Sequence, residues 1–179
     1  MKLDRDGWLE GARRVASPNF DGRPDDAGVD LLLVHSISLP PGEFGGGAIE
    51  ALFTNRLECD AHPYFEQLRG LRVSAHFLVR RTGEVVQFVS TGMRAWHAGV
   101  SRWRARARCN DCSVGVELEG TDDAPFTGAQ YASLAALTGA LREHLALAEF
   151  AAHSDVSPAR KTDPGTHFDW LRFLAALCA

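Results

Sequence analysis

The apolar run in residues 29–38, VDLLLVHSIS, restricts the fold of this chain more than any other segment. Its leucines and the following valine are consecutive and do not alternate with polar residues. A strand with this pattern is buried on both faces, as happens when other elements cover both sides of a sheet. We therefore expect residues 29–38 to form a fully buried strand of a central sheet.

Three further segments have the patterns of strands. Residues 75–90, AHFLVRRTGEVVQFVS, read as two apolar strands around an RRTG turn, which predicts a hairpin. Residues 113–120, SVGVELEG, alternate, with Val114, Val116 and Leu118 on one face. Residues 149–153, EFAAH, predict one more short strand. Residues 94–112 lack a clean period and are expected to form a long loop.

Helices are expected between and after these strands. Residues 48–57 predict a short helix, and residues 126–145 have the clearest helical spacing of apolar residues, with Thr127 and Gln130 in a capping-box pattern. The segment FDWLRFLAALC predicts a C-terminal helix. This mixed order predicts an α/β (α+β) fold with a mixed central sheet flanked by helices, in a single domain over residues 1–179.

Composition and charge favour an ordinary globular protein. Of the 179 residues, 45% are hydrophobic and 23% are charged, and the length is sufficient for a real core. The formal net charge of −4 gives no reason to expect binding to nucleic acid or to an acidic membrane. The N-terminal residues have no apolar signal-peptide core, and no stretch approaches the roughly 18 apolar residues of a membrane span. We therefore expect a cytoplasmic protein whose four cysteines are free thiols.

The stretch AAHSDVSPARKTDPG, residues 151–165, contains the most chemically distinctive side chains. His153 and Asp163 are metal-ligand types, and a hydrolytic zinc site usually has three protein ligands and an open position. His35, near the carboxyl end of the apolar strand, is the best candidate for the third ligand, because sheets of this kind tend to bind ligands at such ends. The alternatives are a polar surface loop and a structural histidine at the strand end.

Glu117 and Lys161 are the candidate catalytic side chains. Glu117 lies in mid-strand between valine and leucine, and a buried carboxylate there could act as a general base beside a metal. Lys161, two residues before Asp163, could stabilise an oxyanion. The alternatives are a glutamate on a solvated strand face, as Glu119 two residues later would suggest, and a solvated loop lysine.

Several blocks of the chain, taken together, carry a family resemblance. The segments LLLVHSISLPPGEFGGG, SAHFLVRRTGEVVQFV, RAWHAGVS, RCNDCSVGVELEGTDD and AHSDVSPARKTDPG resemble, in this order, those of the AmpD-type N-acetylmuramoyl-L-alanine amidases. The match extends from about Trp8 to Phe173. The resemblance implies the mixed-sheet fold that this family shares with peptidoglycan recognition proteins.

The same resemblance implies the roles of five residues. It implies that Zn²⁺ is held by His35, His153 and Asp163, and that Glu117 and Lys161 are catalytic. It implies hydrolysis of the amide between the lactyl group of muramic acid and L-alanine, with 1,6-anhydro-muropeptides of cell-wall recycling as the substrate. No obligate protein partner, nucleic acid or membrane is implied. The departures, such as serine at position 36 where asparagine is usual, touch no expected ligand.

Substrate-binding residues are harder to assign from the sequence. Arg72 and Arg108 are candidates for gripping a stem-peptide carboxylate, although solvated loop arginines are the alternative. Trp96 and Val100 are expected to wall the cleft, and His97 is expected to line it. The alternative function is a module that binds peptidoglycan fragments without cleaving them. Such modules of the wider superfamily typically lack a zinc ligand, whereas this chain has all three candidates.

Overall fold

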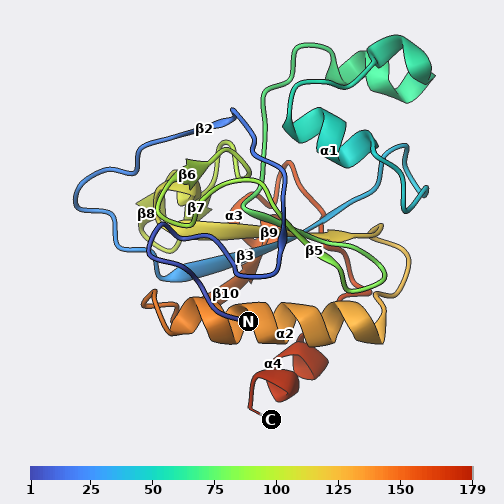
Figure 1. Ribbon diagram of the computed structural model, residues 1–179. Coiled ribbons are helices and arrows are strands. Elements are labelled where there is room, and N and C mark those ends of the chain that lie inside the picture. Colours follow the sequence, from blue (N-terminus) through green and yellow to red (C-terminus); the bar gives the residue numbers. More distant parts are fainter. Residues whose placement is uncertain (179) are drawn as a thin grey trace.

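A six-stranded mixed sheet forms the centre of the computed structural model, which describes residues 1–178 (Figure 1). The strand order across the sheet is β1-β5-β4-β9-β3-β10. Its strands are β1 (Arg13–Arg14), β3 (Leu31–Ile37), β4 (Phe77–Val79), β5 (Val85–Gln87), β9 (Ser113–Glu119) and β10 (Glu149–Ala152). Two small antiparallel ribbons lie outside it, β2 (Phe20–Asp21) with β6 (Arg94–Ala95), and β7 (Arg102–Trp103) with β8 (Arg106–Ala107).

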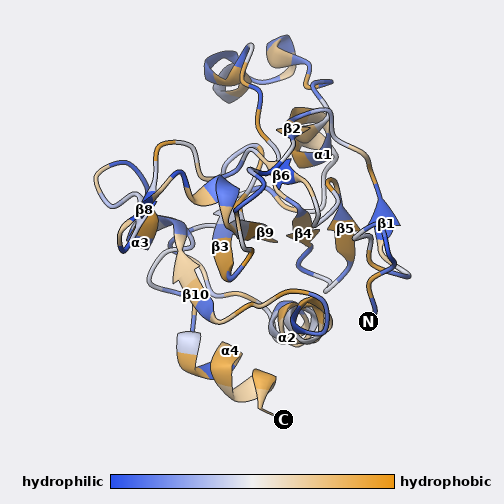
Figure 2. Cartoon of the chain, turned by 90° about the vertical axis from the view of Figure 1, so that its left-hand side faces the viewer, coloured by the Kyte–Doolittle hydropathy of each residue, from blue (hydrophilic) through white to orange (hydrophobic). Residues whose placement is uncertain are grey.

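Helices lie on both sides of this sheet. In both ribbon views α2 and α4 lie below the sheet and α1 lies above it (Figures 1 and 2). The helices are α1 (Ala48–Phe53), α2 (Gly128–Arg142), α3 (His153–Val156) and α4 (Trp170–Leu177), with short 3-10 helices at Cys59–Ala61, Pro63–Leu68 and Cys109–Asp111. Within residues 1–178, no helix has both the length and the apolar character needed to cross a membrane. The expected mixed sheet with flanking helices is confirmed.

Strand β3 is central to the arrangement because it pairs in parallel with β9 on one side and with β10 on the other. In this register His35 lies directly beside Glu117, and Ala152, the last residue of β10, lies beside Val34. Residues paired in this way in a parallel sheet point to the same face. The carboxyl ends of the three strands therefore bring His35, Glu117 and His153, the residue after β10, to one edge of the sheet.

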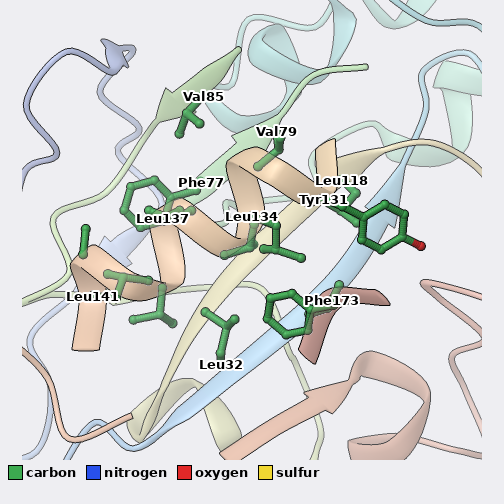
Figure 3. Close-up of a cluster of buried hydrophobic side chains, with 14 of the residues drawn as sticks. Leu32, Phe77, Val79, Val85, Leu118, Tyr131, Leu134, Leu137, Leu141 and Phe173 are labelled. Carbon is green, nitrogen blue, oxygen red and sulfur yellow. The ribbon is translucent and has the colours of Figure 1, made fainter. Parts of the chain in front are cut away.

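The main core lies between the sheet and helices α2 and α4. Alternate residues of the strands face it, and Leu134, Leu137 and Leu141 of α2 pack against them (Figure 3). Phe173 of α4 closes the same cluster and is fully buried. Helix α2 begins as predicted, since the Thr127 side chain accepts a hydrogen bond from the Gln130 backbone N–H and the Gln130 side chain accepts one from the Thr127 backbone N–H.

The opposite face of the sheet is covered as well, partly by irregular chain. Leu78 and Val86 pack there against α1, while Leu31 and Leu33 pack against Ala98 and its neighbours. All seven residues of β9 are consequently buried, so the alternative of a solvated face for Glu117 and Glu119 is wrong. The segment 94–112, expected to be a loop, contains the short strands β6 to β8 and a 3-10 turn.

Two other boundaries differ from those expected. Helix α1 ends at Phe53, earlier than predicted, and Asn55 after it has a positive φ of 60° that no α-helix continues through. The strand expected over residues 149–153 is present as β10 but ends at Ala152, and His153 opens the one-turn helix α3. The four cysteines are free thiols, as expected.

The packing of α2 leads to a stability prediction. Leu137→Ala should lower the free energy of unfolding by about 2–5 kcal/mol, because it leaves a cavity in a fully buried cluster. Leu171→Ala, at a position that is 81% exposed on α4, is the control and should change it by less than about 0.5 kcal/mol. Urea denaturation of both variants measures the difference, and equal losses would contradict the assignment of this core.

Candidate active site

Three side chains converge at the carboxyl edge of the sheet. His35 Nδ1 lies 2.9 Å from His153 Nδ1 and 3.2 Å from Asp163 Oδ2, and His153 Nδ1 lies 3.0 Å from the same carboxylate oxygen. Among the residues that the structure describes, they form the cluster suited to holding a metal ion. The sequence had predicted these three residues, two from the stretch 151–165 and one from the carboxyl end of the strand at 29–38.

The donor set fits a bound cation. Three ligand atoms on a tetrahedral zinc with bonds of about 2.0–2.1 Å lie roughly 3.3 Å apart, close to the separations observed here. His153 Nε2 lies 3.2 Å from the carbonyl oxygen of Ala98, so this nitrogen carries the hydrogen and Nδ1 keeps its lone pair. Lone pairs that face one another at such distances repel unless a positive charge lies between them.

The protonation states also suit metal binding. Burial lowers the pKa of His35 to about 4, although the nearby Asp163 opposes the shift, so the ring is neutral at pH 7. Burial also works against the ionised form of Asp163, but interaction with the His153 and His35 rings outweighs it and holds the pKa of this carboxyl below its usual range. The site therefore presents the neutral imidazole of His35 and the carboxylate of Asp163 beside the ring of His153.

Glu117 lies beside this cluster in an unusual environment. Its Oε2 is buried and makes no hydrogen bond within residues 1–178. Burial, followed by the nearby charge of Asp163, raises the pKa of Glu117 well above its usual value, while Lys161 opposes the shift. A buried carboxyl with a raised pKa beside a metal site is the kind of group that exchanges protons during catalysis.

Glu119, two residues further along β9, provides a contrast. Its carboxylate accepts hydrogen bonds from Arg80 Nη1 at 2.7 Å, from the Gly45 backbone at 2.7 Å and from the Arg81 backbone at 3.1 Å. These bonds satisfy its oxygens and connect the strand to the glycine-rich segment before α1. Of the two buried glutamates on this face, Glu119 is therefore structural and Glu117 remains available for chemistry.

A cleft of about 450 Å³ opens beside these groups. Its polar lining includes Glu117, His153, Lys161 and Asp163. Its apolar lining includes Leu39, Leu52, Tyr64, Leu68, Leu71 and Trp96. Tyr64 and Leu71 are substantially exposed, so a ligand in the cleft would cover apolar surface that is now in water.

Only some of the expected substrate-binding residues line the cleft. Trp96 and His97 line the cleft. Arg72 is exposed and lines a smaller neighbouring depression, and Arg108 is 75% exposed and pairs with Asp111 at 3.1 Å. Neither arginine lines the cleft itself, so their roles stay predictions. Val100 does not form the expected wall, because its side chain points to solvent and is 86% exposed.

Asp122 has a structural role that the sequence analysis missed. It accepts a hydrogen bond from Ser36 Oγ at 3.0 Å and another from the hydroxyl of Thr162. It therefore ties the residue after His35 to the residue between Lys161 and Asp163. Gly165 has a φ of +81°, and a Cβ there would overlap the Asp122 backbone, so this close approach requires glycine. The acidic residues after GVELEGT were the available signal, but nothing in their spacing indicated a partner.

Comparisons with known proteins agree with this geometry. The family model described as N-acetylmuramoyl-L-alanine amidase matches residues 25–166. The 1,6-anhydro-N-acetylmuramyl-L-alanine amidase AmpD of Citrobacter freundii is 58% identical over 177 residues, covering 98% of this chain and 94% of that protein. A crystal structure of an AmpD selenomethionine derivative superimposes with a TM-score of 0.96 at 57% identity, covering 99% of both chains.

More distant structures share the fold. AmiD from Escherichia coli, in complex with anhydro-N-acetylmuramic acid-L-Ala-D-gamma-Glu-L-Lys, gives a TM-score of 0.62 at 24% identity, with 97% of this chain and 65% of that one covered. Drosophila peptidoglycan recognition protein SA gives 0.56 at 18%, with coverage of 85% and 80%. The chain therefore belongs to the N-acetylmuramoyl-L-alanine amidase family of hydrolases, and within it to the branch of the AmpD 1,6-anhydro-N-acetylmuramyl-L-alanine amidases.

Proposed function

We propose that this amidase is zinc-dependent and cleaves 1,6-anhydro-muropeptides between the lactyl group and L-alanine during peptidoglycan recycling. The observation that carries the proposal is the convergence of His35, His153 and Asp163 within 3.2 Å, beside a buried carboxyl without a partner. Two imidazoles and one carboxylate are a common ligand set of hydrolytic zinc. The cytoplasmic setting expected from the sequence stays a prediction.

In the proposed hydrolysis, the metal ligands, Glu117 and Lys161 have separate roles. His35, His153 and Asp163 would hold Zn²⁺, which would supply a Lewis acid to polarise a carbonyl and make water more acidic. Glu117 accepts the proton of the attacking water at Oε2 and then delivers it to the departing amine of L-alanine. Lys161 places a positive charge at the edge of the cleft, where negative charge develops on the carbonyl oxygen of the scissile amide.

The apolar part of the cleft suits the sugar. A 1,6-anhydro sugar is bicyclic and lacks the free reducing-end hydroxyl, so it presents a rigid and less polar surface. We assign this sugar to the apolar side chains, with Trp96 as the main contact, and the amide to the polar part. The complex of AmiD with an anhydromuramyl peptide supports this class of ligand, since that protein shares the fold. Arg72, next to Leu71 at the rim, and Arg108 remain the proposed contacts for stem-peptide carboxylates.

The first prediction of this proposal concerns the metal. The purified protein should contain one zinc ion per chain, and His153→Ala should lose both the metal and the activity. His144→Ala, at an exposed position, is the control and should keep both. Metal analysis and hydrolysis of an anhydro-muropeptide measure the effect, and full activity of the metal-free protein would refute the zinc assignment.

The second prediction separates chemistry from binding. Glu117→Gln should keep zinc and the fold but lower kcat by about 10²–10⁴-fold, because a positioned proton-transfer group contributes that much. Lys161→Ala should also lower kcat, and Lys161→Arg should recover part of the loss because it keeps the charge. Glu143→Gln, on an exposed glutamate, is the matched control. A Glu117→Gln enzyme that turns over at the normal rate would show that another group moves the proton.

The third prediction concerns the sugar. The value of kcat/KM should be higher for an anhydro-muropeptide than for the reducing-sugar muropeptide with the same stem peptide. Trp96→Ala should reduce this preference, because it removes the largest apolar contact proposed for the bicyclic sugar. Equal kcat/KM values for the two substrates in the unmodified enzyme would remove the proposed specificity but leave the amidase activity.

A further inference from the structure

His35 has a second hydrogen-bond partner that the mechanism above does not use. Its Nδ1 faces the ligand cluster, and its Nε2 lies 3.0 Å from Nδ1 of His97. Metal-binding histidines usually give their second N–H to a carboxylate, a backbone carbonyl or water. Here the partner is another imidazole, which can either donate or accept, so it does not by itself determine where the hydrogens lie.

The next groups along the chain of hydrogen bonds remove this ambiguity. Ser113 Oγ donates to the carbonyl oxygen of Cys109 at 2.6 Å, and a carbonyl oxygen can only accept. The hydroxyl hydrogen is therefore committed to Cys109, and Ser113 Oγ accepts from His97 Nε2 at 3.4 Å. His97 then has a free lone pair on Nδ1 and accepts the hydrogen of His35 Nε2. His35 is left with its lone pair on Nδ1, the form that binds a metal.

The surrounding chain holds His97 in this position. The carboxamide oxygen of Asn110 accepts hydrogen bonds from the backbone N–H groups of His97, at 3.2 Å, and Ala98, at 2.8 Å. The His97 ring lies against β9 at Gly115, where a Cβ would overlap the ring atoms. Glycine is required at position 115 because it leaves space for the His97 ring. Its backbone conformation is not the reason, since its φ lies outside the left-handed region.

We propose that His97 is a positioning residue for the metal site, which it serves through His35, and that Ser113 and Gly115 set its tautomer and its place. This inference rests on the metal site of the proposed function. It differs from the expected role of His97 as a substrate contact, because it predicts an effect on metal affinity in the absence of substrate.

The test compares variants that keep or remove the acceptor at position 97. His97→Leu removes it, and His97→Asn keeps an oxygen near the place of Nδ1. Competition with a chelator measures the zinc affinity of each metal-free variant, and cobalt absorption spectra report the ligand geometry. We expect His97→Leu to weaken zinc binding about 10–100-fold, and His97→Asn to recover most of the loss. His144→Leu should bind zinc like the unmodified protein.

One further variant and one further measurement keep the test decisive. Ser113→Ala deletes one oxygen and should weaken zinc binding several-fold, and thermal unfolding of the metal-free variants separates an effect on metal affinity from loss of the fold. If His97→Leu is unfolded, His97→Asn and Ser113→Ala decide the question. Normal zinc affinity in folded His97→Leu, with a higher KM alone, would assign His97 to substrate binding and overturn the proposal. Absence of zinc binding by the unmodified protein would instead refute the proposed function.

Discussion

The parallel pairing of β3 with β9 and β10 is the constraint on which the site depends. It places His35 beside Glu117 and directs β10 so that His153 follows at the same edge. A shift of one residue in the register of β9 would turn Glu117 toward the core under α2, because side chains alternate between the two faces. Such a shift would also turn Val114, Val116 and Leu118 out of this core, where they are fully or nearly fully buried. The hydrophobic core therefore fixes the register that brings His35 and Glu117 together.

Burying the polar groups of the site opposes folding, and each group has a feature that reduces this free-energy cost. Burying an ionised group without partners costs several kcal/mol, and Glu117 avoids much of this by the rise in its pKa. Asp163 is stabilised by its two histidine partners. By contrast, Glu119 on the same strand has a structural role, because Arg80 and two backbone N–H groups donate hydrogen bonds to its carboxylate. A cation at the ligand cluster would relieve the remaining repulsion among lone pairs.

Periodic patterns allowed the framework of this fold to be predicted, and the resemblance allowed the ligand set to be predicted. The apolar run at 29–38 became β3, and the Thr127–Gln130 pattern became the start of α2, because both depend on local sequence. Burial of both faces of β9 was not predictable from its alternation, since the cover comes from distant segments. Likewise, the hydrogen bonds of Asp122 with Ser36 and Thr162, and the contact of Ser113 with His97, join residues that are distant in the sequence. Single residues carry no pattern that indicates such partners.

The two sides of the sheet have different roles, and this explains why the site lies where it does. The side under α2 and α4 is a closed core of large buried apolar side chains. The other side is covered partly by irregular chain, which can approach strands closely where glycine permits. Gly115 admits the His97 ring against β9, and Gly165 admits the loop of Asp163 against Asp122. His35 comes from a rigid strand and His153 directly follows one, whereas Asp163 comes from a loop that Asp122 holds. The loop ligand is thus the one whose position depends most on side-chain hydrogen bonds.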